Sequence, residues 1–178
     1  TLFRSSGTDR INEAVNILNL SEDEIIVNVQ GDEPFIEVEV VEAVINRVKQ
    51  IKENNEDIMI TSCYKEISSS LADDPNHVKV VLDEHSNAIY FSRAKVPYHR
   101  DHHENATYSG HLGIYGFTKK SLNAFCKLAS SKLENIEKLE QLRAIDNGHK
   151  IAMVKVVSKS FGIDTQEDLN NALKIFGK

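Results

Sequence analysis

The chain has 178 residues, of which 40% are hydrophobic and 27% are charged, and its formal net charge is −6. This length and composition suit one soluble globular domain with a sizeable core. The acidic balance argues against a protein that coats nucleic acid or binds anionic membranes, and no stretch approaches the roughly 18 consecutive apolar residues of a membrane span. Cys63 and Cys126 lack metal-ligand spacing, so we expect reduced core cysteines in a cytoplasmic protein.

The first element that the sequence predicts is a helix from about Asp9 to Leu18, because its apolar residues fall on one face. The polar loop R-S-S-G-T-D-R, residues 4–10, precedes it, and Thr8 or Asp9 is a candidate cap. Such a loop is either an ordinary helix cap or a place where a polar ligand binds at a helix start. The residues alone leave both interpretations open.

A short apolar run from Ile25 to Val29 predicts a strand buried on both faces, which ends in Q-G-D-E-P at residues 30–34. Ligands of open α/β sheets bind just beyond the carboxyl ends of strands. Gln30 offers amide donors and an acceptor there, and Asp32 offers an oxygen ligand for a hard cation. A polar turn after a core strand is the plainer interpretation.

The middle of the chain combines helical and strand-like patterns. Two apolar runs separated by D-E-H-S-N predict a hairpin. Arg93 follows this hairpin, and such a cation either lies on solvated surface or faces an anionic substrate. The predicted elements are a helix over about 37–52, a strand over 58–63, a loop or short helix over 68–75, hairpin strands over 78–82 and 88–92, and a loop over 97–109.

The last third of the chain continues the alternation. A helix is predicted after Thr118. In the helix predicted after that one, Glu140 and Gln141 are adjacent, so they cannot both point into the core. Asp164 lies between a strand and a final helix that Thr165 opens with a capping box. The other predicted elements are a strand over 111–117, a helix over about 135–146 and a strand over 151–157.

This order of elements predicts an α/β fold with a mixed, mostly parallel sheet, helices on both faces and a hairpin excursion. Asp32 and Asp164 each follow a strand, so the two carboxylates are candidates to share one divalent cation. The spacing alone does not establish that they meet in space.

Six motifs together resemble the 3-deoxy-manno-octulosonate cytidylyltransferases, also called CMP-Kdo synthetases. They occur in the family's order and extend over nearly the whole chain. The motifs are S-G-T-D-R at 6–10, V-N-V-Q-G-D-E-P at 27–34, Y-F-S-R at 90–93, H-L-G-I-Y-G-F at 111–117, L-E-Q-L-R at 139–143 and G-I-D-T-Q-E-D-L at 162–169.

The resemblance implies a Rossmann-like nucleotidyltransferase in which CTP and Kdo, the sugar acid 3-deoxy-D-manno-octulosonate, give CMP-Kdo and pyrophosphate for lipopolysaccharide biosynthesis. It implies a cytoplasmic homodimer, formed in part by the hairpin region, with no nucleic-acid or membrane partner. It assigns Mg²⁺ to Asp32 and Asp164, the nucleotide to Ser6, Gly7, Thr8 and Arg10, and the sugar acid to Gln30, Arg93, His111, Tyr115, Glu140 and Gln141. Arg93 would contact the sugar carboxylate.

One departure from the family pattern concerns the triphosphate. The family carries a loop of the type A-R-x-x-S-x-R-L-P-G-K, whose Arg and Lys grip CTP, and no part of residues 1–178 matches it. We therefore expect one nucleotidyltransferase domain that lacks its N-terminal triphosphate-binding part and is inactive alone. The alternatives are a cytidylyltransferase for another acidic sugar, such as sialic acid, and a non-catalytic nucleotide-binding or dimerisation fragment.

Overall fold

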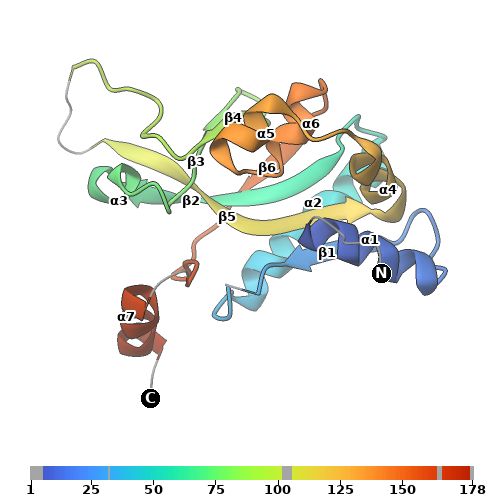
Figure 1. Cartoon of the computed structure of the whole chain (residues 1–178), viewed down its shortest axis with the longest axis horizontal. Coiled ribbons are helices and arrows are strands. Elements are labelled where there is room, and N and C mark those ends of the chain that lie inside the picture. Colours follow the sequence, from blue (N-terminus) through green and yellow to red (C-terminus); the bar gives the residue numbers. More distant parts are fainter. Residues whose placement is uncertain (1–5, 32, 102–105, 164–165, 177–178) are drawn as a thin grey trace.

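A mixed sheet forms the centre of the structure, a computed structural model that describes residues 6–31, 33–101, 106–163 and 166–176 (Figure 1). Its strands in the described ranges are β1 (Ile25–Val29), β2 (Ile60–Ser68), β3 (Lys79–Leu82), β4 (Ala88–Ser92), β5 (Thr107–Thr118) and β6 (Ile151–Lys155). The helices are α1 (Gly7–Ile17), α2 (Val38–Asn54), α3 (Ser69–Asp73), α4 (Lys119–Lys127), α5 (Lys132–Glu137), α6 (Leu142–Asp146) and α7 (Gln166–Phe176).

The α/β class and the hairpin are confirmed, but the prediction of a mostly parallel sheet is wrong. The strand order is β4-β3-β5-β2-β6, and β1 also pairs with β5. Among the described pairings, only that of β2 with β6 is parallel. The alternation of strands and helices does give β1, β2, β3 and β6 one common direction. Strand β5 runs the opposite way between them, and this converts neighbouring pairs into antiparallel ones.

Helices cover both faces of the sheet, as predicted (Figure 1). Helix α2 buries Val40 and Val44 against Cys63 and residues of β5 on one face. The other face carries the larger core, to which α1, α4, α5 and α6 contribute. Strand β1 pairs only with β5 within the described residues, and Val29 at its end is 41% exposed, so the expectation of burial on both faces is wrong there.

Two helix boundaries differ from the prediction. Helix α1 begins at Gly7, because the Ser6 hydroxyl, rather than Thr8 or Asp9, caps it by accepting a hydrogen bond from the Asp9 N–H at 3.2 Å. The helix predicted over 135–146 is two short helices, since Lys138 takes a left-handed conformation with φ 55°. The break places Glu140 and Gln141 on a turn, where their side chains can point in different directions.

Other predictions are confirmed. The helix predicted after Thr118 is α4, which Thr118 opens with a capping box, and Cys63 and Cys126 are free thiols. Thr165, the predicted cap of α7, lies outside the described residues. None of the helices in the described part of the chain has the length and apolarity needed to cross a bilayer.

Gly116 allows the closest contact between α2 and the sheet. A Cβ atom at this position would lie 2.7 Å from the Val44 Cγ1 and 2.8 Å from the Val48 Cγ2. Both neighbours are β-branched and buried, so neither can move away at low cost. The glycine therefore fixes how near α2 lies to β5.

We expect Gly116→Ala to destabilise the fold by about 1–3 kcal/mol, because overpacking forces side chains from their rotamers. Urea unfolding measures the change. Gly31→Ala is the matched control, because nothing lies within 4 Å of a Cβ built there. Equal stability of the two variants would contradict the close packing of α2 on β5.

Candidate active site

A cavity of about 200 Å³ opens at the place where β5 changes its strand partner. Strand β1 pairs with residues 114–118 of β5, and β3 meets β5 at Gly110, on the edge opposite β2. The stretch of β5 between these pairings, which includes Leu112 and Gly113, faces the cavity. The cavity therefore lies at an interruption of the sheet, beyond the end of β1, where ligands of α/β proteins commonly bind.

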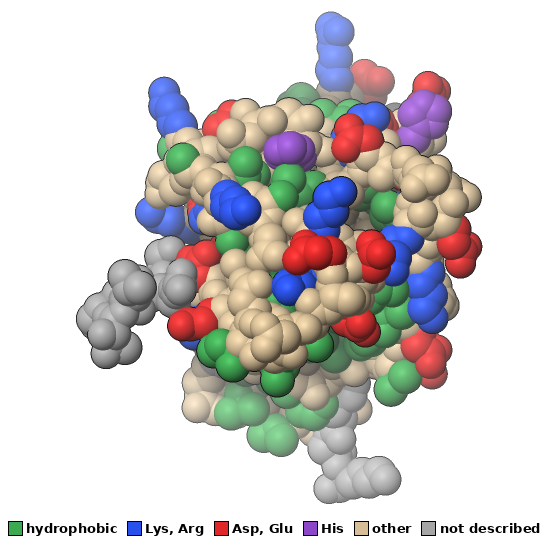
Figure 2. Space-filling view, turned by 90° about the vertical axis from the view of Figure 1, so that its right-hand side faces the viewer, with side chains coloured by type: hydrophobic (Ala, Val, Ile, Leu, Met, Phe, Trp, Pro, Cys, Tyr) green, Lys and Arg blue, Asp and Glu red, His purple; other side chains and the backbone are tan. Residues whose placement is uncertain are grey.

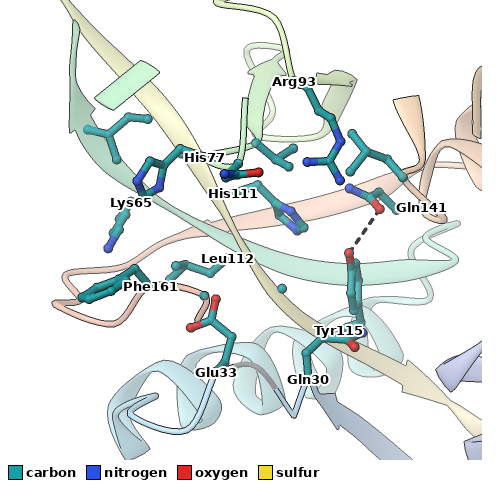
Figure 3. A pocket seen from close by; sticks show the side chains of 17 residues that line it. Gln30, Glu33, Lys65, His77, Arg93, His111, Leu112, Tyr115, Gln141 and Phe161 are labelled. Carbon is teal, nitrogen blue, oxygen red and sulfur yellow. Dashed lines mark hydrogen bonds between the residues drawn. The ribbon is translucent and has the colours of Figure 1, made fainter. Parts of the chain in front are cut away.

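The cavity collects most of the residues that the sequence assigned to the sugar acid (Figure 3). They come from the end of β1, the end of β4, the middle of β5 and the start of α6, and they are Gln30, Arg93, His111, Tyr115 and Gln141. Glu140 is the exception, because it does not line the cavity. Residues from distant parts of the chain thus converge on one concave site.

Arg93 is held by main-chain and carboxylate partners. Its Nε donates to the Glu137 carbonyl at 2.8 Å and its Nη1 donates to the Pro75 carbonyl at 3.1 Å. The Glu137 carboxylate accepts from the Arg93 N–H at 2.9 Å and from the Ser92 hydroxyl at 2.7 Å. The buried Lys79 ammonium donates to the Arg93 carbonyl at 2.6 Å. The Arg93 Nη2 makes no hydrogen bond with the described residues, so it remains available to an anion in the cavity.

Tyr115 and Gln141 form a second polar wall. The Tyr115 hydroxyl donates to the Gln141 Oε1 at 3.2 Å, and Figure 3 shows this bond beside Arg93. Gln141 is only 3% exposed, yet its Nε2 has no hydrogen-bond partner among the described residues. A buried amide donor without a partner costs free energy, which a ligand oxygen would recover.

His111 occupies the centre of the cavity wall (Figure 3). Its ring packs edge-on against Phe91, with ring centroids 4.9 Å apart. Burial of the imidazole lowers the pKa of His111 from 6.5 to about 3. The ring is therefore neutral at physiological pH and acts through hydrogen bonds rather than through charge.

A segment after β6 closes one side of the cavity. The Lys65 ammonium donates to the Ser160 carbonyl, and burial lowers the Lys65 pKa, while the nearby Glu33 carboxylate favours the charged form. The Ser160 hydroxyl donates to Glu33 at 2.7 Å. These bonds bring Phe161 and Gly162 to the cavity.

Sequence reasoning missed Glu33, Lys65 and His77, which also line the cavity. Glu33 lies in the segment Q-G-D-E-P, for which the sequence predicts a polar turn after the strand. Lys65 lies beyond the predicted end of its strand at Cys63, whereas β2 continues to Ser68. A longer strand would have placed Lys65 on an element that faces the site.

The residues assigned to the nucleotide lie together at the start of α1. Ser6 caps the helix, and Gly7, Thr8 and Arg10 form its first turn. The Thr8 hydroxyl donates to the Glu140 carboxylate at 2.7 Å. Since Gln141 lines the cavity, the adjacent residues Glu140 and Gln141 connect the start of α1 to the cavity wall.

The two predicted metal ligands, Asp32 and Asp164, lie outside the described residues. Their described neighbours Gln30, Glu33 and Gly162 all line the same cavity. Within the described residues, no group of three or more His, Cys, Asp or Glu side chains is placed to hold a metal ion.

Known proteins are similar to this chain in sequence and in fold. A family model for cytidylyltransferases matches residues 4–151. A 3-deoxy-manno-octulosonate cytidylyltransferase of Wolinella succinogenes is 55% identical over 97% of this chain and 72% of its own length. One of Helicobacter pylori is 51% identical over 97% of this chain and 70% of its own length. This chain belongs to the 3-deoxy-manno-octulosonate cytidylyltransferase family.

The fold of this chain is similar to that of solved structures. The structure of a CMP:2-keto-3-deoxy-manno-octonic acid synthetase complexed with CTP matches with a TM-score of 0.83 at 33% identity, over 97% of this chain and 68% of that one. A putative glucose-1-phosphate thymidylyltransferase of Bacillus anthracis matches with a TM-score of 0.58 at 13% identity, and this likeness concerns the fold alone. The prediction of a nucleotidyltransferase fold is confirmed.

We expect Glu137→Ala to lower the free energy of unfolding by about 1.5–3 kcal/mol, because hydrogen bonds to a charged group are lost from the end of β4. Urea unfolding checks this value, and Glu39→Ala, an exposed glutamate on α2, is the control. The same loss should weaken binding of a carboxylate ligand, since the main-chain N–H of Arg93 loses its acceptor and only the bonds of the guanidinium to the Glu137 and Pro75 carbonyls remain. A variant as stable as the control would contradict the role of Glu137 in anchoring Arg93.

Proposed function

We propose that this chain carries the sugar-acid site of an enzyme that transfers the cytidylyl group of CTP to Kdo, with release of pyrophosphate. The observation that carries the proposal is the convergence of Gln30, Arg93, His111, Tyr115 and Gln141 on one cavity in a member of this family. No observation favours the alternatives of a sialic-acid enzyme or a non-catalytic fragment.

The polar groups of the cavity suit an acidic sugar. Arg93 presents guanidinium donors that match a carboxylate, and the buried Nε2 of Gln141 offers a further donor. The neutral ring of His111 complements them with an uncharged hydrogen-bonding group. A sugar with a carboxylate at one end and hydroxyls along its length uses all three kinds of group.

The reaction needs orientation more than covalent catalysis. The anomeric hydroxyl of Kdo attacks the α-phosphate of CTP in line, the new P–O bond forms, and the bond to pyrophosphate breaks. In our proposal the cavity orients the sugar, and Ser6, Gly7, Thr8 and Arg10 contact the nucleotide. The Thr8–Glu140 hydrogen bond would fix the position of the nucleotide site relative to the sugar site, because Gln141, which lines the sugar site, follows Glu140 directly.

We propose further that Asp32 and Asp164 hold Mg²⁺, which would neutralise phosphate charge when bound. The support is that neighbours of both, Glu33 and Gly162, line one cavity. Asp32→Asn and Asp164→Asn should each weaken Mn²⁺ binding at least about tenfold, as measured by water-proton relaxation with Mn²⁺ as the probe. Unchanged Mn²⁺ affinity in both variants would refute a shared metal site.

The substrate assignment is tested by comparing sugar acids. We expect turnover with Kdo to exceed turnover with sialic acid by orders of magnitude, because a site built to bind particular hydroxyls rejects ligands that leave its polar groups unpaired. Pyrophosphate release at saturating CTP and Mg²⁺, with the chain joined to a segment that bears the triphosphate loop, measures both rates. Equal rates would mean that the cavity does not select the sugar.

The same pyrophosphate assay also tests the activity of this chain on its own. Residues 1–178 contain no match to the triphosphate loop of the family, so we propose that this chain alone makes CMP-Kdo slowly. Loss of one well-placed donor to a transition state costs on the order of 10²–10³ in rate. Addition of a segment that bears the loop should restore activity, and equal activity without it would show that other residues hold the triphosphate.

We propose a homodimer in which the β3–β4 hairpin takes part. Ile89 on β4 is 55% exposed, so the hairpin offers an apolar side chain that a partner could cover. Sedimentation should show that Ile89→Glu shifts the chain toward monomer, whereas Glu84→Gln in the hairpin loop should not. A monomeric wild-type chain would contradict the proposal.

We also propose a cytoplasmic location, which the free thiols support and cell fractionation tests.

A further inference from the structure

The buried hydroxyl of Ser62, on β2, lies between His111 and a carbonyl of β5. The Ser62 Oγ is 2.7 Å from the Ile114 carbonyl oxygen and 2.9 Å from the His111 Nε2. A second carbonyl oxygen, that of Leu112, is farther away at 3.5 Å. Ser62 is fully buried, so no water competes for these positions. The hydroxyl is therefore shared between one carbonyl and one imidazole nitrogen.

The positions of the protons follow from the number of hydrogen-bond donors and acceptors in this arrangement. A carbonyl oxygen can only accept, so the 2.7 Å contact between two oxygens requires that the Ser62 hydroxyl donates to Ile114. The hydroxyl has one hydrogen and cannot also donate to the imidazole. The contact at 2.9 Å is then a hydrogen bond only if the His111 Nε2 carries the proton and the Ser62 oxygen accepts it.

We propose that Ser62 is a positioning residue, which holds His111 in the Nε2–H tautomer so that the bare Nδ1 lone pair accepts a hydrogen bond from a hydroxyl of the ligand in the cavity. The identity of that ligand as Kdo rests on the proposed function, but the tautomer does not. Ser62 is not among the sugar-acid residues that the motifs implied. The motifs also implied no contact between Ser62 and His111.

The remaining contacts of His111 agree with this assignment. The Nδ1 makes no hydrogen bond with the described residues, and His111 lines the cavity. Phe91 and Tyr115 hold the ring, with centroids 4.9 Å and 5.6 Å away, so it cannot easily flip. Burial keeps the imidazole neutral, since it lowers the pKa to about 3, and a neutral ring has one donor and one acceptor.

The geometry arises from an irregularity in the sheet. The register between β2 and β5 shifts between Ser62 and Cys63, so that Ser62 faces Tyr115 while Cys63 faces Leu112. Residues 113 and 114 are extra on β5, and the Ile114 carbonyl turns to Ser62. Such irregularities re-aim side chains beside active sites. Here the shift supplies the acceptor that fixes the direction of the Ser62 hydroxyl.

The tautomer of His111 also determines which positions in the cavity offer donors and which offer an acceptor. Arg93 and Gln141 present donors, whereas the His111 Nδ1 presents an acceptor. A carboxylate fits against the donors, and a hydroxyl that donates fits against His111. A ligand with a methoxy group at that position leaves the lone pair of His111 without a donor.

The test is ¹⁵N NMR of histidine-labelled chain without ligand. We expect His111 to show the pattern of a single Nε2–H tautomer, with a visible, slowly exchanging ring N–H signal. In Ser62→Ala the carbonyl and the ring both lose their partner, so that signal should vanish and the tautomers should mix. Thr61→Val is the matched control, because it removes the neighbouring hydroxyl of β2, which faces α2, and it should leave His111 unchanged.

A titration with Kdo then separates this inference from the proposed function. Binding should shift the Nδ1 resonance of the wild type, and Ser62→Ala should bind Kdo about three- to tenfold more weakly, as expected for one hydrogen bond. An Nδ1–H tautomer in the wild type, or an unchanged ring signal in Ser62→Ala, overturns the role of Ser62. The expected tautomer without any response to Kdo overturns the assignment of His111 to the sugar and leaves the role of Ser62 intact.

Discussion

The pairing of β5 with three other strands is the constraint on which the structure depends. One edge of β5 pairs with β2 over most of its length, while the other edge pairs first with β3 and then with β1. A strand of this length cannot satisfy its backbone unless these partners share its edges. On this edge, the stretch of β5 between its pairing with the start of β3 and its pairing with the end of β1 is left open, and the cavity lies there. The site is thus a consequence of how the sheet is assembled.

The two faces of β5 have different tasks. Leu112, Ile114 and Gly116 face α2, where the absence of a side chain at Gly116 lets the helix approach. His111 and Tyr115 point to the other face and to the cavity. Packing on one side therefore fixes the strand that carries polar groups on the other, which is how a rigid scaffold positions a site.

Main-chain carbonyls hold many of the polar side chains near the cavity. Lys65, Lys79, Arg93 and Ser62 each donate to a backbone oxygen. Carbonyls remove the cost of burying these donors without neutralising the cations, so positive charge stays available at the cavity. On the face seen in Figure 2, by contrast, acidic and basic side chains are interspersed, and no large area of one sign appears.

The sequence by itself determined the element types and the identity of the family. Local patterns placed β1, α2, the hairpin and the helix after Thr118, because each depends on residues close in the chain. The motifs named Gln30, Arg93, His111, Tyr115, Glu140 and Gln141 as one group, and all of them except Glu140 line the cavity. Only the tertiary structure decided that β5 runs in reverse between its neighbours, that Glu140 contacts Thr8 rather than the cavity, and that Ser62 lies against His111. These features depend on strand register and on contacts between distant residues, which local patterns of side chains do not encode.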